Sequence, residues 1–397
     1  MPRITQLRLR GVRVFDRVDL ELDAGLTVLV GTNGSGKSTI LECLEILRKA
    51  AHPGFLPQFY GVHRGLPALL RKGENKLVIG TRIATDDDWL LDYDLEIEQG
   101  GGGNARIRET LRNVEDGFAI LIEGPAGTRV WSKQEPVRSE GSGDTAIGSE
   151  LAAKEDERIR SVAKALRGIE VHLGFDTRAS WAARTYRRPE TIRGAATLYP
   201  ADRLDLLGVN LANAWNELLT RPAAQRDEAL GMVRLGLGEA FSDVVVRPDP
   251  GGGTIHLAVR LRDHPEHPIF ASDLSDGQLT WLAFVAIVLL AQQRTIVAID
   301  EPELHLHPSL LGRVMAALGS PSMKTQTLVA THSDRALELI DEPAKALRVC
   351  ESNRSRATIR RLDEAAWPRW REAFGDLGQV RASGYLERAL QVSEDAP

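Results

Sequence analysis

Eight residues near the N-terminus have the types and spacing of a loop that binds a polyphosphate. Gly31-Thr-Asn-Gly-Ser-Gly-Lys37-Ser38 matches the pattern GxxxxGK[ST], between an apolar run and a helical pattern. Glycines let backbone N–H groups turn toward phosphate, and the helix N-terminus adds partial positive charge. Lys37 would reach the β- and γ-phosphates in a catalytic role, and Ser38 would bind Mg²⁺. We therefore expect nucleotide contacts from Gly31, Asn33, Gly34, Ser35, Gly36, Lys37, Ser38 and Thr39.

A plainer interpretation of this loop is a glycine-rich turn that only caps a helix. The eight-residue pattern arises by chance in about one chain of this size in a hundred, and the strand and helix context lowers that frequency. Nucleotide binding is therefore the favoured interpretation.

Two carboxylates follow a short apolar run in the last third of the chain. Residues 296–299 are aliphatic and lead directly into Asp300-Glu301. A buried parallel strand delivers side chains to the edge where α/β sheets bind ligands. We expect Asp300 to hold the Mg²⁺ shell and Glu301 to orient or deprotonate the attacking water. Alone, such a pair is more often a surface turn or a helix cap, but the phosphate loop reverses that preference.

A second candidate anion site precedes the acidic pair by about two dozen residues. Leu274-Ser-Asp-Gly-Gln278 opens a long apolar helical pattern, in which Ser275 is suited to cap the helix. The exposed amides of Gly277 and Gln278 could then bind an anion at the helix N-terminus. The alternative is a capped helix with no ligand.

Apolar runs and helical spacings predict the elements that position these motifs. Alternation over 18–22 indicates a half-buried strand, and the run 26–30 is typical of a buried parallel strand. Helical spacing follows over 37–49. The last third alternates helices over about 275–293, from 308 and from 333 with strands over 295–299 and 327–330. The fold class is therefore α/β with a mixed sheet.

The middle of the chain has a different pattern. Alternating β segments from about 76 to 131, separated by Asp- and Gly-rich turns, indicate an antiparallel lobe, and 132–150 is expected to be a mobile loop. Helices are predicted over 150–166 and 209–237, the latter interrupted near Arg221-Pro222, and strands around Val244 and over 254–262. We divide the chain into an N-terminal core half (1–50), an antiparallel β and helical insertion lobe (51–193), a C-terminal core half (194–350) and a C-terminal strand with helices (351–397).

Composition excludes several classes of protein. The 397 residues carry 50 Lys and Arg against 55 Asp and Glu, a net charge of −5, which rules out a globally basic nucleic-acid coat. Cys43 and Cys350 give neither a disulfide framework nor a thiolate metal site. The N-terminus lacks the apolar segment of a signal peptide, and the longest apolar run, 279–291, covers roughly 20 Å, too little for a bilayer. We expect a cytoplasmic protein with no membrane partner.

Taken in order, GTNGSGKST, LSDGQ, IVAIDEPELHLHP and ATHS resemble the motifs of the ABC-type ATPase superfamily. The set is most similar to the RecF-like and SMC-like branch, and within it to stand-alone AAA-family ATPases that resemble the ATPase domain of OLD-type proteins without a TOPRIM domain. The resemblance covers residues 1 to about 50 and about 194 to 350. It implies an ABC-type P-loop ATPase head, with ATP and Mg²⁺ as cofactors.

The same resemblance implies a composite site shared by two protomers. The loop 31–39 of one copy would face Ser275, Gly277 and Gln278 of the other across the nucleotide, with His332 as the catalytic switch histidine near the γ-phosphate. Residues 304–307 occupy the D-loop position. Asp276 stands where a glycine is usual, which argues against a transporter subunit. For the Q-loop, Gln58 is the candidate that the sequence offers.

The resemblance further implies an ATP-dependent homodimer that acts as a conformational switch in DNA repair or antiphage defence, with a nuclease or other effector as partner. The alternatives are the energising subunit of a membrane transporter and a nucleotide-binding regulator with negligible turnover. A built-in nuclease is disfavoured because the 65 residues after His332 hold no DxD acid pair. The chain also lacks the heptads of a long coiled-coil arm.

Two groups of residues invite other interpretations. The run Arg184-Thr-Tyr-Arg-Arg188, extended by Arg193, could contact DNA phosphates and stack on a base, although a solvated charged face is the favoured alternative. His305 and His307 could suggest a metal site, but two imidazoles are too few ligands for zinc. We expect them to make D-loop contacts.

Overall fold

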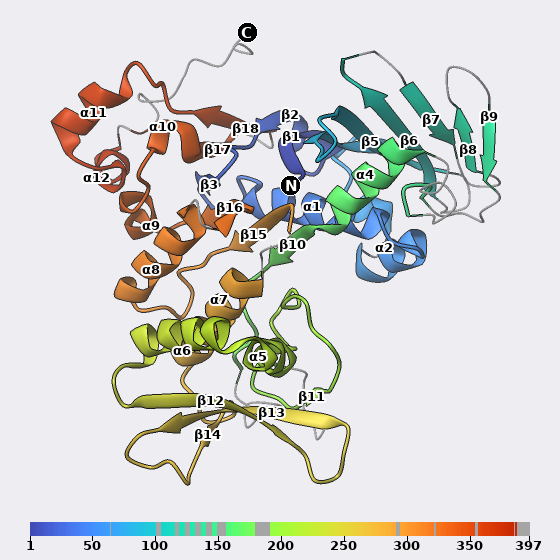
Figure 1. The fold of residues 1–397 in the computed structure, drawn as a ribbon. Coiled ribbons are helices and arrows are strands. Elements are labelled where there is room, and N and C mark those ends of the chain that lie inside the picture. Colours follow the sequence, from blue (N-terminus) through green and yellow to red (C-terminus); the bar gives the residue numbers. More distant parts are fainter. Residues whose placement is uncertain are drawn as a thin grey trace.

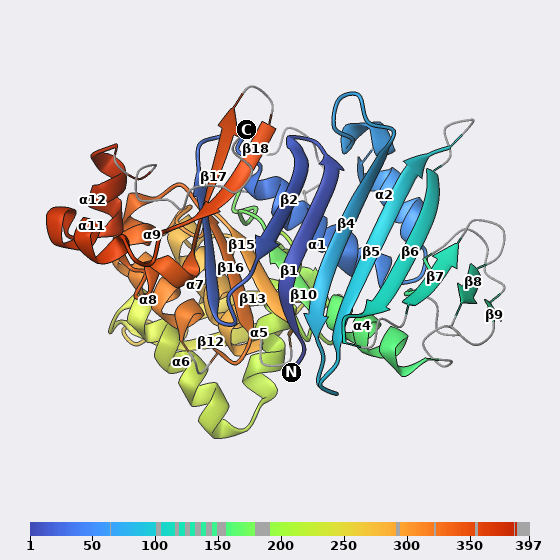
Figure 2. The same ribbon diagram turned by 90° about the horizontal axis from the view of Figure 1, so that it is seen from above.

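The computed structural model describes residues 1–63, 65–100, 105–115, 119–123, 128–131, 136–139, 145–148, 156–178, 191–290, 294–320, 323–353, 356–384 and 386. These residues form three sheets with helices between and around them (Figures 1 and 2). Across these ranges, no helix has both the length and the apolar character that crossing a bilayer requires.

A six-stranded mixed sheet lies at the centre of the fold, in the order β10-β15-β16-β3-β17-β18. All neighbouring strands are parallel except β17 and β18. The strands are β3 (Leu26–Gly31), β10 (Ile169–His172), β15 (Ile296–Asp300), β16 (Gln326–Thr331), β17 (Leu347–Asn353) and β18 (Arg356–Arg361). Because parallel strands end at one edge, the sequence that follows β3, β15 and β16 is brought together there. The predicted α/β class with a mixed sheet is confirmed.

A second sheet is antiparallel and has eight strands, in the order β2-β1-β4-β5-β6-β7-β8-β9. The strands are β1 (Arg3–Val12), β2 (Phe15–Glu21), β4 (Lys76–Ala84), β5 (Leu90–Gln99), β6 (Ala105–Asn113), β7 (Ala119–Glu123), β8 (Thr128–Trp131) and β9 (Pro136–Ser139). The antiparallel strands expected in the insertion thus continue the sheet that β1 and β2 begin. Strand β10 also lies within the expected insertion, but it belongs to the mixed sheet, where it pairs with β15. The proposed boundaries at 50, 193 and 350 stay predictions.

The expectation of a mobile loop over 132–150 is wrong where the structure describes it. Strand β9 pairs with β8, and residues 145–148 are buried. The Thr145 hydroxyl donates to the Ala50 carbonyl, and the Ala146 and Ile147 amides donate to the Glu109 carboxylate. These long-range bonds outweigh the local preference of a Gly- and Ser-rich segment for loop structure. The remaining positions of this stretch lie outside the described residues.

A third, small sheet pairs β11 (Ala196–Thr197), β13 (Thr254–Leu261) and β12 (Phe241–Pro248), with β14 (Ile269–Phe270) beside β13. Helices α5 (Leu211–Thr220) and α6 (Ala223–Leu237) pack on it. The break between these helices lies at Arg221-Pro222, as predicted, because proline removes a donor that a continuing helix needs.

Two hydrophobic clusters order the layers. One cluster joins the inner face of the antiparallel sheet to α1 (Lys37–Ala50) and to one face of the mixed sheet. The other joins the opposite face of the mixed sheet to α7 (Asp276–Leu290), α8 (Pro308–Gly319), α5, α6 and the small sheet. Helix α7 is apolar all round because it is buried between the mixed sheet and α5 and α6.

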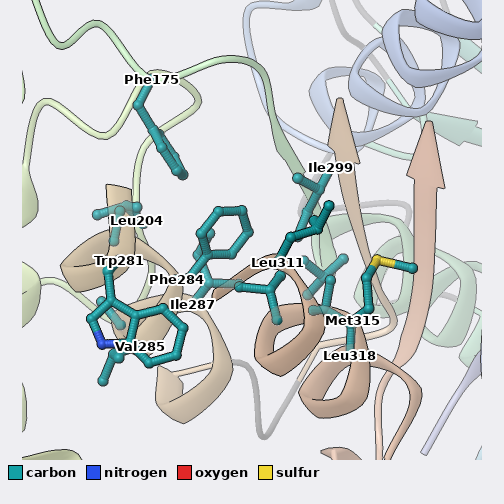
Figure 3. Close-up of a cluster of buried hydrophobic side chains, with 14 of the residues drawn as sticks. Phe175, Leu204, Trp281, Phe284, Val285, Ile287, Ile299, Leu311, Met315 and Leu318 are labelled. Atoms are coloured by element: carbon teal, nitrogen blue, oxygen red, sulfur yellow. The ribbon is translucent and has the colours of Figure 1, made fainter. Parts of the chain in front are cut away.

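Figure 3 shows this second cluster, with side chains of α7 beside those of α8 and Ile299 of β15. The ring of Phe284 meets that of Phe175 edge to face, with centroids 5.8 Å apart. The remaining helical elements are α2 (Phe55–His63), the 3₁₀ turn Leu66–Ala68, α4 (Glu157–Arg167), α9 (Asp334–Glu338), α10 (Pro343–Ala346), α11 (Trp367–Phe374) and α12 (Leu377–Ala382). Because α7 is packed in this cluster, it holds the residues at its N-terminus, 274–278 (the Ser275 segment), against the mixed sheet, which carries Asp300.

Candidate functional site

The glycine-rich loop connects β3 to α1, and three glycines shape it. Gly36 has a φ of 97°, and an added Cβ would lie 2.3 Å from the Phe15 ring. At Gly31 a Cβ would lie 2.1 Å from the carbonyl oxygen of Cys350 on β17. Gly34 has a φ of 79° and open space where its Cβ would be. Two of these positions exclude a side chain by close packing, and the third keeps the loop surface open.

The Lys37 side chain is buried and folds back over the loop. Its Nζ donates to the carbonyls of Gly31 at 2.9 Å and Thr32 at 3.2 Å. Burial lowers the pKa of the Lys37 ammonium, against the opposing effect of Asp300 and Glu301 nearby. Among the described residues, the buried Ser35 hydroxyl has no hydrogen-bond partner. A cation and an unsatisfied hydroxyl therefore lie within a loop whose open side could accept an anion.

Ser38 and Asp300 are far apart in the sequence but meet at the edge of the mixed sheet. The Ser38 hydroxyl donates to Asp300 Oδ2 at 2.9 Å. Burial raises the pKa of the Asp300 carboxyl, although the Ser38 bond and the Lys37 charge oppose that effect. A hydroxyl and a carboxylate in contact are hard oxygen ligands, and the ammonium beside them suits phosphate. This donor set fits a triphosphate with Mg²⁺.

Glu301 and His332, which the sequence assigned separate catalytic roles, lie side by side. Glu301 Oε1 lies 3.3 Å from His332 Nε2. Glu301 has a φ of 49°, which is strained for a residue with a side chain, and its amide donates to the Ala330 carbonyl at 2.7 Å. Such strain is concentrated at functional sites, where the surrounding structure enforces it. Here it turns the carboxylate toward the imidazole at the end of β16.

Two further residues hold the backbone of His332, and sequence reasoning missed both. Glu303 Oε1 accepts from the His332 amide at 2.9 Å and from the Thr331 hydroxyl at 2.7 Å. Arg381 of α12 donates from Nη1 to the His332 carbonyl at 3.0 Å and to Asp334 at 2.9 Å. Glu303 could have been found because it lies two residues after Glu301. Arg381 lies in the C-terminal helices, where no motif marks it.

The Ser275 segment forms a reciprocal cap at the start of α7. Ser275 Oγ accepts from the Gln278 amide at 3.3 Å, and Gln278 Oε1 accepts from the Ser275 amide at 2.9 Å. The D-loop packs directly on it, since a Cβ at Gly277 would lie 2.9 Å from the His305 carbonyl oxygen. The predicted cap of Ser275 is present, and the segment is exposed at its tip.

Two sequence interpretations are corrected by the structure. Arg193 does not extend an exposed basic run: its side chain is 8% exposed and binds the Ser275 segment. Gln58 lies in α2, which follows the far end of α1, about 20 Å along that helix from the phosphate loop. It is therefore too distant for a Q-loop, because helix α1 carries the chain away from the glycine-rich loop before α2 begins.

The histidines of the D-loop do not share one environment. His307 Nδ1 accepts from the Ser309 amide and caps α8, whereas His305 Nδ1 lies 3.8 Å from Asp276 Oδ2. Residues 184–188, the rest of the basic run, lie outside the described residues.

Comparison with known proteins identifies the family. The profile described as "AAA domain, putative AbiEii toxin, Type IV TA system" matches residues 26–338, which is most of the chain. The chain belongs to this AAA-domain family. The matched range of the AAA domain runs from β3 to the end of α9, and so contains the phosphate loop, the Ser275 segment, the acidic pair and His332.

Solved structures similar to this AAA domain are head domains of SMC proteins. The SMC head with an extended coiled coil, bound to the C-terminal domain of ScpA from Pyrococcus furiosus, aligns with a TM-score of 0.52 and 14% identity, over 94% of this chain and 100% of that chain. An SMC head bound to the C-terminal winged-helix domain of ScpA gives 0.48 and 15%, over 92% and 99%. The SMC head domain from Thermotoga maritima gives 0.44 and 14%, over 91% and 99%. The alignment with a TM-score of 0.52 confirms the predicted SMC-like head fold.

Proposed function

We propose that the protein binds and hydrolyses ATP with Mg²⁺ and that it dimerises on ATP as a conformational switch. The observation that carries this proposal is the convergence at one sheet edge of the Lys37 loop, the Ser38–Asp300 contact and the Glu301–His332 pair. Lys37 and the loop amides bind the phosphates, and Ser38 with Asp300 holds the Mg²⁺ shell. When bound, the Mg²⁺ supplies charge to neutralise the phosphate oxygens.

Hydrolysis in this proposal uses the carboxylate of Glu301, the residue with the strained backbone. Glu301 accepts a proton from the attacking water, since its side chain is partly exposed and lies beside His332 at the edge of the sheet where Ser38 meets Asp300. His332 orients the water and the γ-phosphate, and Glu303 and Arg381 hold the His332 backbone in place.

The Ser275 segment supports the dimeric part of the proposal. Its cap binds the Ser275 and Gln278 amides, so the amides that remain for an anion at the α7 N-terminus are those of Asp276 and Gly277, and residues 304–307 lie against Gly277 in the same chain. In a head-to-tail dimer, Ser275, Gly277 and Gln278 of one protomer would face the nucleotide that the partner's loop holds. Each site would then be completed by the second copy.

Glu301→Gln tests this proposal directly. The variant should abolish phosphate release while ATP converts monomer to dimer, as measured by sedimentation velocity. Glu342→Gln is the matched control, because that carboxylate is exposed and paired with Lys345 away from the site. A Glu301→Gln protein that hydrolyses at the wild-type rate, or that stays monomeric in saturating ATP, would contradict the proposal.

The biological setting we propose is DNA repair or antiphage defence, together with a nuclease or other effector. The matching family's description names a toxin of a type IV toxin–antitoxin system, which supports defence. DNA as a ligand is tested by a gel-shift titration with and without ATP across a salt series. Binding directed at phosphates should weaken steeply as the salt concentration rises. A gel shift that does not change with salt, or no gel shift even at low salt, would count against DNA as a ligand.

A further inference from the structure

A carboxylate lies at the one helix terminus where an anion would have to bind. Asp276 is the first residue of α7, between Ser275 and Gly277. A triphosphate approaching this end would meet a like charge, and like charges in contact cost binding free energy unless a cation offsets them. The site therefore needs a positive partner for Asp276.

Arg193 is that partner, and the structure holds it in a closed cage. Its Nη2 donates to Asp276 Oδ1, and its side chain is 8% exposed. Nη1 donates to the carbonyls of Ala271, Ser272 and Leu274, and Nε donates to the Thr177 carbonyl at 2.6 Å. All three nitrogens of the guanidinium are thus bound, so the charge is fixed beneath the start of α7.

The carbonyls in this cage come from two separate segments. Thr177 belongs to the loop that follows β10, at the carboxyl edge of the mixed sheet, and 271–274 lead into α7. Backbone carbonyls can position a guanidinium but carry no net charge, so the formal counter-charge that touches Arg193 is Asp276. His305 lies on the other side of Asp276, at 3.8 Å from Oδ2.

We propose that Arg193 is a positioning residue for the composite site, which neutralises Asp276 so that the Ser275 segment can accept the phosphates held by a second copy of this chain. The inference rests on the proposed ATP-dependent dimer. Loss of the Arg193 charge should weaken the dimer, whereas nucleotide binding to the protomer's own Lys37 loop should stay as it is.

The experiment uses the Glu301→Gln protein as parent and measures its dimer dissociation constant in saturating ATP by sedimentation velocity. Arg193→Gln keeps an amide that can donate to the carbonyls but removes the charge, and it should weaken the dimer about tenfold or more. Arg193→Lys keeps the charge but not the planar fork, so it should weaken the dimer clearly less than Arg193→Gln does. Adding Asp276→Asn to Arg193→Gln should restore the dimer to within about threefold, because no carboxylate then remains to be neutralised.

Two readouts separate charge from folding. Binding of a fluorescent ATP analogue at protein concentrations below dimerisation shows whether each variant still forms its own loop. Arg178→Ala is the matched control, since Arg178 pairs with Asp176 in the loop after β10 and its side chain is 72% exposed. If Arg193→Gln binds the analogue poorly, Arg193→Lys decides the question on a folded protein.

Three outcomes would overturn the inference. These are an Arg193→Gln dimer as tight as the parent's, an Arg193→Lys dimer as weak as a charge-free one, and no recovery on adding Asp276→Asn. A parent that itself stays monomeric in ATP would overturn the proposed function, and the inference with it. Failure of the inference alone is therefore distinguishable.

Discussion

The two large sheets of the molecule place charged residues in opposite ways. In the mixed sheet, β3, β15 and β16 are buried on both faces and carry no charged side chain before their carboxyl ends, and the charges of Lys37, Asp300 and Glu301 lie at or just beyond those ends. In the antiparallel sheet, one face is apolar and the other carries acids on β5 between bases on its neighbours. The first sheet gathers charge at an edge, and the second spreads it over a face.

The charges on the antiparallel face compensate each other within the chain. Arg8 on β1 contacts Asp92 at 2.7 Å and Asp94 at 2.9 Å, across the intervening strand β4. Gly80 of β4 makes this possible, because a Cβ there would lie 2.0 Å from Asp94 Oδ1. Arg82 also binds Asp92. Charges that are satisfied in this way stabilise the sheet, whereas those at the mixed-sheet edge are arranged around a space for a ligand.

One buried ionic cluster in the mixed sheet sharpens the comparison and carries the largest expected effect on stability. Arg294 Nε donates to Glu170 on β10 at 2.8 Å, and His172 Nε2 lies 2.7 Å from the same carboxylate. Glu170→Gln should lower the free energy of unfolding by about 3–5 kcal/mol, because it removes the buried counter-charge of Arg294 and leaves that guanidinium only the exposed Asp202 carboxylate, 3.8 Å away. Urea unfolding at pH 7 measures this. Glu170→Leu with Arg294→Met should regain most of the loss, and equal losses for single and double variants would contradict the explanation.

The same cluster predicts a pH dependence. Burial opposes ionisation of Glu170, but His172 and Arg294 outweigh it and hold the pKa of this carboxyl below its ordinary value of 4.5. A lowered folded-state pKa stabilises the protein above the unfolded pKa, and that contribution is lost as the pH falls through the folded pKa. The stability gap between wild type and Glu170→Gln should therefore narrow below pH 4.5. A gap that stays constant down to pH 3.5, about one unit lower, would be inconsistent with it.

Two lysines, one beyond the carboxyl edge of the mixed sheet and one on the antiparallel sheet, test the functional side of the comparison. Lys37→Ala should weaken nucleotide binding about a hundredfold, since charged hydrogen bonds to phosphate are lost, without lowering the melting temperature. Lys76→Ala, which removes a half-exposed partner of Glu96 on the antiparallel sheet, should leave nucleotide binding as it is. Fluorescent nucleotide titration and thermal unfolding distinguish the two. Equal nucleotide affinities for the two variants would break the comparison.

The residues that hold His332 should have a smaller effect on turnover. Glu303→Gln keeps one acceptor for the His332 amide, whereas Arg381→Ala removes the brace on its carbonyl. Arg381→Ala should lower kcat about tenfold with little change in KM, because it misplaces a group without removing it. Arg371→Ala, at an exposed position on α11, is the control. A change in KM alone would assign Arg381 to substrate binding instead.

The smallest effects belong to the antiparallel face. Arg8→Ala should destabilise by about 1–2 kcal/mol, since it is mostly buried and serves two carboxylates. Arg108→Ala, whose side chain is 54% exposed and 3.5 Å from Glu96, should cost about 0.3 kcal/mol. Neither should alter phosphate release at saturating ATP. A larger loss for Arg108 than for Arg8 would show that burial does not set the strength of these pairs.

Sequence reasoning reached the site where local pattern encodes geometry. The strand and helix around the loop at Gly31 and the cap at Ser275 follow from motifs whose spacing fixes backbone conformation. The order of the mixed sheet could not be read in this way, because β10 joins it from a segment expected to be an insertion. Strand pairing depends on contacts far apart in the chain, which no local period records.

The roles of two arginines, Arg193 and Arg381, could not be read from the sequence for one physical reason. Arg193 and Arg381 act through guanidinium bonds to backbone carbonyls, and any arginine in the sequence could make such bonds. Their roles are set by which loop folds over them. The Q-loop assignment of Gln58 was wrong for the converse reason. Its residue type was suitable, but it lies on α2, beyond the end of α1 that is far from the site.

The position of β3 inside the mixed sheet has a consequence for biosynthesis. Its two neighbours, β16 and β17, come about 300 residues later in the chain, and β17 begins at Leu347. A ribosome that adds about 5–20 residues per second needs roughly 15–60 s after releasing Gly31 to deliver that neighbour. Until then the nascent strand exposes unpaired amides and apolar side chains on both faces. We therefore expect chaperones to protect β3 during translation, and we expect every truncation that stops short of β17 to be inactive, because the glycine-rich loop depends on a strand that the chain supplies only near its C-terminal end.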